Sequence, residues 1–219
     1  MGRMFELEVW GDFACFTRPE MKVERVSYDI PTPSSVRAVF EAIYWKPAIR
    51  WEAVSVEILA PIRFSSFRRN EVGAVVSVGN VKSAMKSGTG SLGLYVEDER
   101  QQRASLLLRD VRYRFRAQMH IDHESQDKSP AAKHYEMFER RAAKGQCFNQ
   151  PYLGTREFSC AFSPERSDTA VIGESRDLGY MLYDMDFSDP ADPQPMFFRA
   201  KLENGIVNFP SRDSTEVMR

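Results

Sequence analysis

Lys133 and His134 stand side by side in the segment PAAKHYEMFERRAAKG, residues 130–145, and together they could move a proton and hold negative charge. Imidazole has the ordinary pKa nearest neutrality, which suits general acid–base catalysis. The apolar positions of the segment recur at helical spacing and predict one buried stripe, formed by Ala131, Tyr135, Phe138 and Ala142. Lys133 points away from that stripe and His134 lies on its shoulder, so packing alone does not require the pair. Taken singly, Lys133 reads as a surface lysine and His134 is ambiguous.

Tyr44 is the third candidate for this chemistry. It follows a predicted helix that has Ser34 as its N-cap and ends before Pro47, with a buried stripe formed by Val36, Val39, Phe40 and Ile43. On its own, Tyr44 is most simply a partly buried core tyrosine. A phenol, an amine and an imidazole could nevertheless cleave RNA without metal, since one group takes the proton of a ribose 2′-hydroxyl, another donates to the leaving 5′ oxygen, and a cation stabilises the phosphorane. This chemistry requires the ends of two helices to meet.

The elements that would position these residues run strand, helix, strand twice along the chain. Alternating apolar residues predict strands at residues 4–10, 54–62, 109–122 and 158–162. Together with the two helices, this order is the split βαβ pattern of ferredoxin-like and RNA-recognition folds, in which both helices cover one face of an antiparallel sheet. We therefore expect an α+β, ferredoxin-like domain over residues 1–165.

Two parts of the chain lie outside this pattern. Residues 70–105 are rich in Gly, Ser and Asn and are expected to form an inserted loop or hairpin excursion. Residues 166–219 contain several short strands, the last two joined by Asn204–Gly205, a pair that suits a type I′ turn. We expect a small antiparallel C-terminal subdomain there.

Two groups of arginines are candidates for contacts with RNA. On the strand at residues 109–122, the face opposite the apolar one carries three arginines at alternate positions: Arg112, Arg114 and Arg116. Upstream, two phenylalanines are interleaved with Arg63, Arg68 and Arg69, a mixture of cations and stacking rings that single-stranded RNA favours. A strand face kept soluble by charge explains the first group equally well.

His120, Asp122 and His123 raise the question of a metal site. On a strand, His120 and Asp122 would share a face while His123 points to the other, so the geometry is poor. No further cluster with metal-ligand spacing accompanies them, and no phosphate-binding, dinucleotide-binding or G-x-S-x-G motif occurs. We predict no metal and no cofactor.

The composition is that of a soluble globular protein, with 42% hydrophobic residues among 219 and a mean hydropathy of −0.45. No run reaches the length of a membrane span, no secretory signal is visible and the three cysteines are far apart, so we expect a cytoplasmic protein with no membrane partner. The formal net charge of −1 argues against a uniformly basic nucleic-acid binder. Residues 101–150, however, hold ten Lys and Arg against six Asp and Glu, so a local basic surface can exist.

Several segments together resemble the Cas-five proteins of type I-C CRISPR systems, the "d" subtype: VWGDFACFTRPE, YDIPTPSSVRAVFEAIYWKPAIRW, PIRFSSFRRNEVG, LRDVRYRFRAQ, KHYEMFERRAAKGQCFNQPYLGTREF and ENGIVNFP. The resemblance runs along the whole chain, and AIYWKPAIRW and QPYLGTREF are its most specific parts. It implies a ferredoxin-like N-terminal domain followed by a small C-terminal sheet. It also implies that the active-site tyrosine of YWKP is Tyr44 here, and that the lysine and histidine of KHY are Lys133 and His134.

The resemblance further implies an endoribonuclease that cleaves precursor CRISPR RNA at the base of the repeat hairpin, by 2′-hydroxyl attack and without metal. Such a protein keeps the 5′ handle of the guide RNA and joins the other subunits of a type I-C interference complex. In this assignment His134 is a general base or acid, Lys133 stabilises the pentavalent phosphate, and Tyr44 orients or deprotonates the 2′-hydroxyl. Two alternatives stay open: a handle-binding subunit without catalysis, and a metal-dependent nuclease that binds or cuts DNA.

Overall fold

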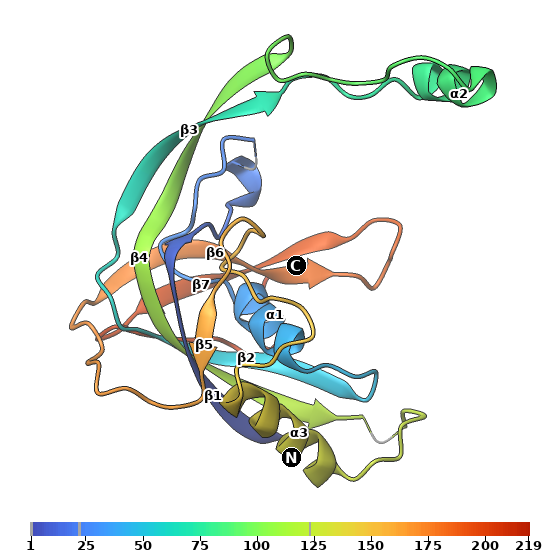
Figure 1. Cartoon of the computed structure of the whole chain (residues 1–219). Helices are drawn as coiled ribbons and strands as arrows, with labels where there is room; N and C mark the ends of the chain where they lie inside the picture. The colour runs from blue at the N-terminus through green and yellow to red at the C-terminus, as the bar shows by residue number, and fades with distance from the viewer. Residues whose placement is uncertain (1, 22, 123) are drawn as a thin grey trace.

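A curved antiparallel sheet forms the body of the molecule (Figure 1). In this computed structural model, which describes residues 2–21, 23–122 and 124–219, the sheet contains β1 (Arg3–Ala14), β2 (Ile49–Ile58), β3 (Phe64–Val72), β4 (Arg100–Ile121), β5 (Ala161–Ser163) and β8 (Ile206–Asn208). The other elements are α1 (Pro33–Ile43), α2 (Val78–Ser87), α3 (Ala131–Ala143), the 3₁₀ helix η1 (Pro19–Met21), and a second sheet of β6 (Arg176–Asp186) and β7 (Gln194–Leu202). None of the helices in these ranges is long and apolar enough to cross a membrane. The predicted α+β class is confirmed.

The long strand β4 lies at the centre of the sheet. The strand order is β5-β1-β4-β2-β8, every one of these pairings is antiparallel, and β3 pairs with the outer part of β4. Helix α1 connects β1 to β2, and α3 connects β4 to β5. This order is compatible with the split βαβ pattern. The ferredoxin-like assignment itself stays a prediction.

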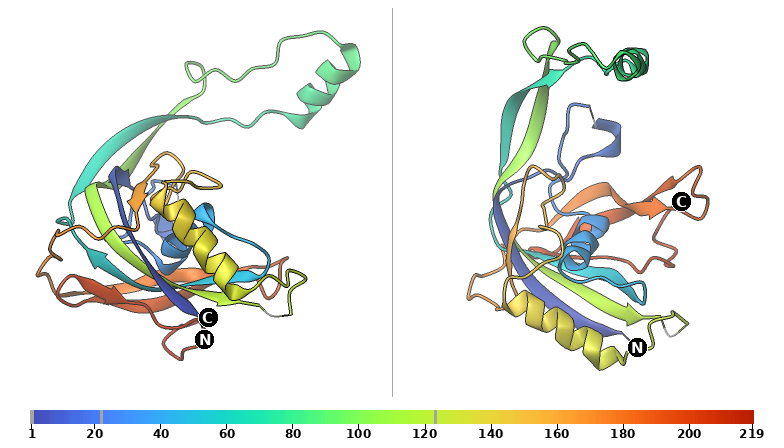
Figure 2. Two further views of the ribbon diagram at one scale, coloured as in Figure 1. Left: turned by 60° about the horizontal axis from the view of Figure 1, so that its bottom comes forward. Right: turned by 45° about the vertical axis from the view of Figure 1, so that its right-hand side comes forward.

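Both of these connecting helices pack on the apolar face of the sheet. Alternate residues of β4 are buried there, as their pattern predicts: Val111, Tyr113, Phe115, Ala117 and Met119. The ring of Trp51 in β2 joins the two helices, since its centroid lies 4.9 Å from that of Phe40 in α1 and 4.8 Å from that of Phe138 in α3. The helices therefore share the concave side of the sheet (Figure 2), which brings their ends together.

Strand β2 differs from the strand predicted at residues 54–62. A bulge between Ala53 and Ser55 changes which alternate residues are buried, so Val54 does not share the buried face of Val56. The strand ends at Ile58, short of the predicted end. Ile58 is still paired with Tyr113 of β4, and its backbone N–H donates to the carbonyl of Gly205 on the other side of the strand.

The N-caps of α1 and α3 are not the predicted ones. In α1 the cap is Thr32 rather than Ser34, and the Thr32 Oγ1 accepts the N–H of Ser35 at 3.3 Å. In α3 the cap is Pro130, which contributes no side-chain hydrogen bond, and the hydroxyl of Ser129 is used elsewhere. Each cap lies within two residues of its prediction, which is the usual uncertainty at helix ends.

Residues 64–108 form an arm that leaves the body of the molecule (Figure 1). β3 pairs with β4 from Phe64 to Val72, and α2 lies beyond the end of this hairpin. Part of the predicted loop or hairpin excursion at 70–105 is thus helical. Ser77 caps α2 and Gly88, with a φ of 65°, ends it, but the helix buries no residue. The absence of a buried stripe explains why its sequence has no helical pattern.

The C-terminal strands are divided between the two sheets. β6 and β7 form the second sheet, and Asn204 and Gly205 make a tight turn with φ angles of 48° and 77°, as their sequence predicts. After this turn β8 pairs with β2 of the main sheet instead of extending β7, and the N–H of Phe209 donates to the carbonyl of Val54 at 2.8 Å. The domain boundary near residue 165 stays a prediction.

Candidate active site

Tyr44 and His134 are in direct contact. The Tyr44 hydroxyl lies 3.0 Å from Nδ1 of His134, although the two residues are 90 positions apart in the chain. Tyr44 caps the C-terminal end of α1, where its carbonyl accepts the indole N–H of Trp51 at 2.9 Å. His134 lies in the first turn of α3. The packing of both helices on Trp51 therefore produces the expected meeting of two helix ends.

Both members of this pair are buried. Tyr44 is 3% exposed and His134 is 1% exposed. Burial raises the pKa of the Tyr44 phenol above its ordinary value, while the positive charge of Arg141 acts in the opposite direction. The phenol is consequently protonated near neutral pH and can donate its proton to Nδ1, which leaves the imidazole proton on Nε2.

Asp127 faces the other nitrogen of the His134 ring. Its carboxylate lies 3.8 Å from Nε2, which is buried and has no hydrogen-bond partner. Hydrogen bonds from the side chain and the backbone of Ser129 hold the pKa of Asp127 below its ordinary value, and the nearby His134 and Lys133 add to this effect. An ionised carboxylate at this position favours a proton on Nε2. Sequence reasoning missed Asp127, and its only signal is its place in the D-x-S stretch before α3.

Lys133 lies next to His134 in sequence but points out to solvent. Its Nζ donates to the hydroxyl of Ser129 at 2.9 Å, and the side chain is exposed. The structure thus brings Tyr44 and His134 into contact and places Lys133 at the surface of the same helix turn. An exposed ammonium in the first turn of α3, next to His134, is available to an incoming phosphate.

Arg141 approaches Tyr44 from two turns further along α3. Its guanidinium carbon lies 5.2 Å from the centroid of the Tyr44 ring, and Nη1 donates to the carbonyl of Ile43 at 2.9 Å. The guanidinium therefore binds a free carbonyl at the end of α1 and holds the tyrosine ring in place.

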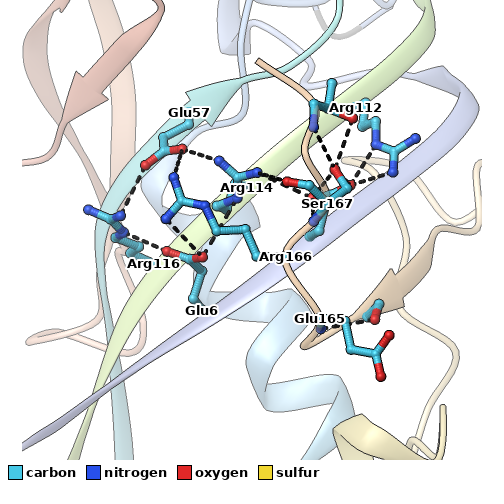
Figure 3. Close-up of polar contacts among 11 residues, drawn as sticks. Glu6, Glu57, Arg112, Arg114, Arg116, Glu165, Arg166 and Ser167 are labelled. Atoms are coloured by element: carbon cyan, nitrogen blue, oxygen red, sulfur yellow. Dashed lines mark hydrogen bonds and ion pairs between the residues drawn. The ribbon is translucent and has the colours of Figure 1, made fainter. Parts of the chain in front are cut away.

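The three arginines of β4 lie in a network of carboxylates (Figure 3). Arg114 is only 1% exposed, and its guanidinium contacts Glu57 at 2.5 Å and Glu8 at 3.4 Å. The expected line of three free guanidiniums is therefore wrong for Arg114, because Glu8 of β1 and Glu57 of β2 lie opposite it in the sheet register. Glu6 is a third carboxylate partner of Arg114, at 3.6 Å, so this buried guanidinium is not available to a phosphate.

Arg112 and Arg116 flank Arg114 and are partly exposed, with 38% and 39% of their side-chain surface accessible. Arg112 contacts Glu8 at 2.5 Å, and Arg116 contacts Glu6 at 2.8 Å. Their positive charge is largely compensated by these carboxylates. A contact between either arginine and RNA stays a prediction.

The other predicted arginines, Arg63, Arg68 and Arg69, lie at the base of the arm. Arg69 is engaged, with Glu71 at 2.6 Å and the hydroxyl of Ser105 at 2.6 Å. Arg63 and Arg68 are exposed and form no ion pair within the ranges that the structure describes. Contacts of these three arginines with RNA also stay predictions.

His120 lies beside Glu52 of β2. Its Nε2 lies 2.9 Å from the carboxylate of Glu52, and His123 lies outside the described residues. No group of three or more His, Cys, Asp or Glu side chains suited to a metal ion occurs in the part of the chain that is described.

The chain matches a family model over residues 4–210, that of Cas_Cas5d, described as CRISPR-associated protein (Cas_Cas5). It is 46% identical over 227 residues to the "CRISPR pre-crRNA endoribonuclease Cas5d" of Mannheimia succiniciproducens, and the match covers all of both chains. It is 40% identical over 231 residues to the protein of the same name from Thermus thermophilus, with 98% of this chain and 94% of the relative covered.

Two solved structures are similar to the fold. One, described as "Crystal Structure of CRISPR-associated Protein", superposes with a TM-score of 0.70 at 22% identity and covers 100% of this chain and 97% of its own. The other is a chain of a "CRISPR RNA-guided surveillance complex", with a TM-score of 0.51 at 14% identity and coverage of 95% and 90%. At these identities the likeness concerns the fold alone.

Proposed function

This chain belongs to the Cas5d family of CRISPR-associated proteins, and we propose on that premise that it is an endoribonuclease that cleaves precursor CRISPR RNA. The observation that carries the proposal for the site is the contact between Tyr44 and His134, with Lys133 on the same helix turn. Two relatives that match nearly the whole chain bear the name of this activity. We place the reaction at the base of the repeat hairpin in the cytoplasm, where transcripts are made.

In the proposed reaction the ribose 2′-oxygen attacks the adjacent phosphorus. The bond between 2′-oxygen and phosphorus forms, the bond from phosphorus to the 5′ oxygen breaks, and the products are a 2′,3′-cyclic phosphate and a 5′-hydroxyl. His134 takes the proton of the 2′-hydroxyl, and the leaving 5′ oxygen takes a proton from solvent. The ammonium of Lys133 stabilises the negative phosphorane. The protonated Tyr44 orients the imidazole, and these groups supply proton transfer and charge without a metal ion.

Access to His134 requires a local rearrangement. The ring is 1% exposed, and the carboxylate of Asp127 occupies the approach to Nε2. RNA must therefore displace Asp127 before the 2′-hydroxyl can reach the base, and a phosphate bound first at the exposed Lys133 would repel this carboxylate. Loss of Asp127 also removes the charge that favours a proton on Nε2. With the proton on Nδ1 instead, donated to the Tyr44 oxygen, Nε2 is free to act as the base.

The same burial favours a second candidate function, a subunit that binds the guide-RNA handle without cleaving it. In that case the contact between Tyr44 and His134 is a packing interaction between two helices. Either function allows the protein to remain on the guide RNA and to join other subunits of a type I-C complex. A structural neighbour with the same fold is a chain of a surveillance complex, which supports such a partnership.

The test is cleavage of a labelled repeat hairpin with chelator present. We expect scission without metal by the unaltered protein, and His134→Ala should slow single-turnover cleavage by about a hundredfold or more while RNA binding is kept. A 2′-deoxy substitution at the nucleotide before the cut should block the reaction. Binding without any scission in the unaltered protein would establish the non-catalytic function. Scission only with a divalent metal, or with the 2′-hydroxyl absent, would contradict the proposed mechanism.

A further inference from the structure

A cleft of about 1020 Å³ opens beside the candidate active site. Its lining includes Trp45 and Lys46, which directly follow Tyr44, together with Phe148 and Arg156 from the segments after α3. Its volume is just above the usual range for ligand-binding pockets, about 300–1,000 Å³. The two sequence stretches AIYWKPAIRW and QPYLGTREF, distant in the chain, both contribute residues to this cleft. The reaction proposed above assigns no role to these lining residues.

Three aromatic side chains are exposed at the cleft, those of Trp45, Phe148 and Tyr152. Trp45 is 51% exposed and Phe148 is 79% exposed. The backbone that carries Phe148 is tied to the end of α1, because the N–H groups of Phe148 and Asn149 donate to the carbonyl of Ala42 at 2.8 and 3.1 Å. These hydrogen bonds hold the backbone of Phe148 in place. Exposed aromatic rings beside cations are typical of sites where unpaired bases stack.

The cleft also carries uncompensated positive charge. Lys46, Arg141 and Arg156 line it, and none of them forms an ion pair within the described ranges of the chain. The carboxylate in the lining, that of Glu41, is already paired with Arg37 at 2.8 Å. The arginines of β4, in contrast, are matched by carboxylates. The cleft therefore combines cations that have no carboxylate partner with exposed rings, which suits a planar anionic ligand.

We propose that this cleft binds an unpaired RNA nucleotide next to the cleaved linkage, with its base on the exposed aromatic rings and its phosphate held by the three cations. Arg141 connects the cleft with the active site, since it lines the cleft and its guanidinium carbon lies 5.2 Å from the centroid of the Tyr44 ring. A strand bound at Tyr44 and His134 thus reaches the cleft within a short distance along its backbone. The inference rests on the proposed function for the identity of the ligand as RNA.

The experiment separates binding from cleavage. Full-length protein carrying His134→Ala is titrated with repeat RNA that has a 2′-deoxy nucleotide at the cut and 2-aminopurine at each unpaired position in turn. We expect the fluorescence of one position beside the cut to be quenched. Adding Trp45→Ala or Phe148→Ala should remove the quenching and raise the Kd by about 5- to 150-fold each, the range for loss of one stacked base. Tyr180→Ala is the matched control, because Tyr180 is 58% exposed on β6 and does not line the cleft.

The charge contribution is tested with Lys46→Ala and Arg156→Ala. Each substitution should remove about one phosphate contact. The slope of log Kd against log salt concentration should therefore fall by about 0.7, the value per contact for a single strand. Lys201→Ala, an exposed lysine on β7, should leave the slope unchanged. Thermal unfolding shows whether each variant is folded, and Phe148→Ala gives a second route if Trp45→Ala unfolds the end of α1.

Unchanged quenching and Kd in the two aromatic variants would overturn the inference. It would also be overturned if these variants bind RNA normally but no longer join a complex with other CRISPR proteins, because the cleft would then be a protein-docking site. The proposed function fails independently, when the unaltered protein binds the repeat but does not cleave it. In that outcome the 2-aminopurine result still decides the role of the cleft.

Discussion

At the scale of single residues, the two nitrogens of the His134 ring have different surroundings. Nδ1 contacts the Tyr44 hydroxyl at 3.0 Å, whereas Nε2 faces the carboxylate of Asp127 at 3.8 Å. The approach of Tyr44 to His134 could be predicted from the sequence, because each stands at the end of a helix with a clear buried stripe. The position of Asp127 could not be predicted, because it lies in an irregular segment that has no periodic pattern. The sequence therefore identified Tyr44 and His134, which lie at helix ends, and missed Asp127, which lies in the loop before α3.

Tyr44→Phe should lower both stability and cleavage. The change removes the hydroxyl and leaves Nδ1 of His134 buried without a partner, a loss of about 1–3 kcal/mol in the free energy of unfolding. Urea unfolding measures the stability change, and single-turnover cleavage of repeat RNA measures the catalytic one. Tyr180→Phe, at an exposed position, is the control and should change neither. A stable Tyr44→Phe protein with full activity would remove the hydroxyl from both roles.

At the scale of elements, the outer face of the sheet is a layer of paired charges. The register places Glu6 of β1 opposite Arg116 and Glu8 opposite Arg114, and Glu57 of β2 is also opposite Arg114. Burial opposes ionisation of Glu8, but hydrogen bonds from Ser167 and Arg112 hold the pKa of its carboxyl below the ordinary value. The alternation within β4 predicted which residues share a face. It could not predict that β4 pairs with β1 and β2. This pairing places carboxylates of the neighbouring strands beside the arginines of β4.

Arg114→Leu should destabilise the sheet strongly. The change leaves Glu8 and Glu57 buried with one cation fewer between them, and we expect the free energy of unfolding to fall by about 3 kcal/mol. Chemical denaturation measures the effect. In the control, Arg199→Ala breaks a solvent-exposed ion pair with Asp177 and should lower the free energy of unfolding far less than Arg114→Leu does. Equal losses in the two variants would mean that Arg114 contributes no more than a surface ion pair.

At the scale of the whole molecule, one apolar core extends from the helices on the main sheet to β6 and β7. Several tyrosine side chains are part of it, and burial raises the pKa of Tyr28, Tyr44 and Tyr113, and raises that of Tyr183 to about 12. Burial also raises the pKa of the Cys160 thiol to about 12. In the folded protein these groups therefore keep their protons at a pH where the unfolded chain has lost them.

Alkaline conditions should consequently unfold the protein. A group with a raised pKa in the folded state contributes stability that is complete below its unfolded value and is lost as the pH rises through the folded value. We expect the free energy of unfolding to fall from about pH 9–10, where free thiols and phenols ionise, and to keep falling toward the value of about 12 of Tyr183 and Cys160. Urea unfolding at a series of pH values measures this. Tyr183→Phe should make the decline shallower, and a stability that stays level through pH 11 would contradict the prediction.

The position of β8 has a consequence for synthesis of the protein. β2 has β4 on one side and needs Ile206–Asn208 on the other, so its second neighbour is translated long after Ile49–Ile58 has left the ribosome. Until then a nascent chain carries an open strand edge, which is a place where unfinished chains can associate. The edge of β2 is covered only when β8 pairs with it. A chain truncated before β8 would keep this edge open, and we expect it to aggregate and to be degraded by proteases.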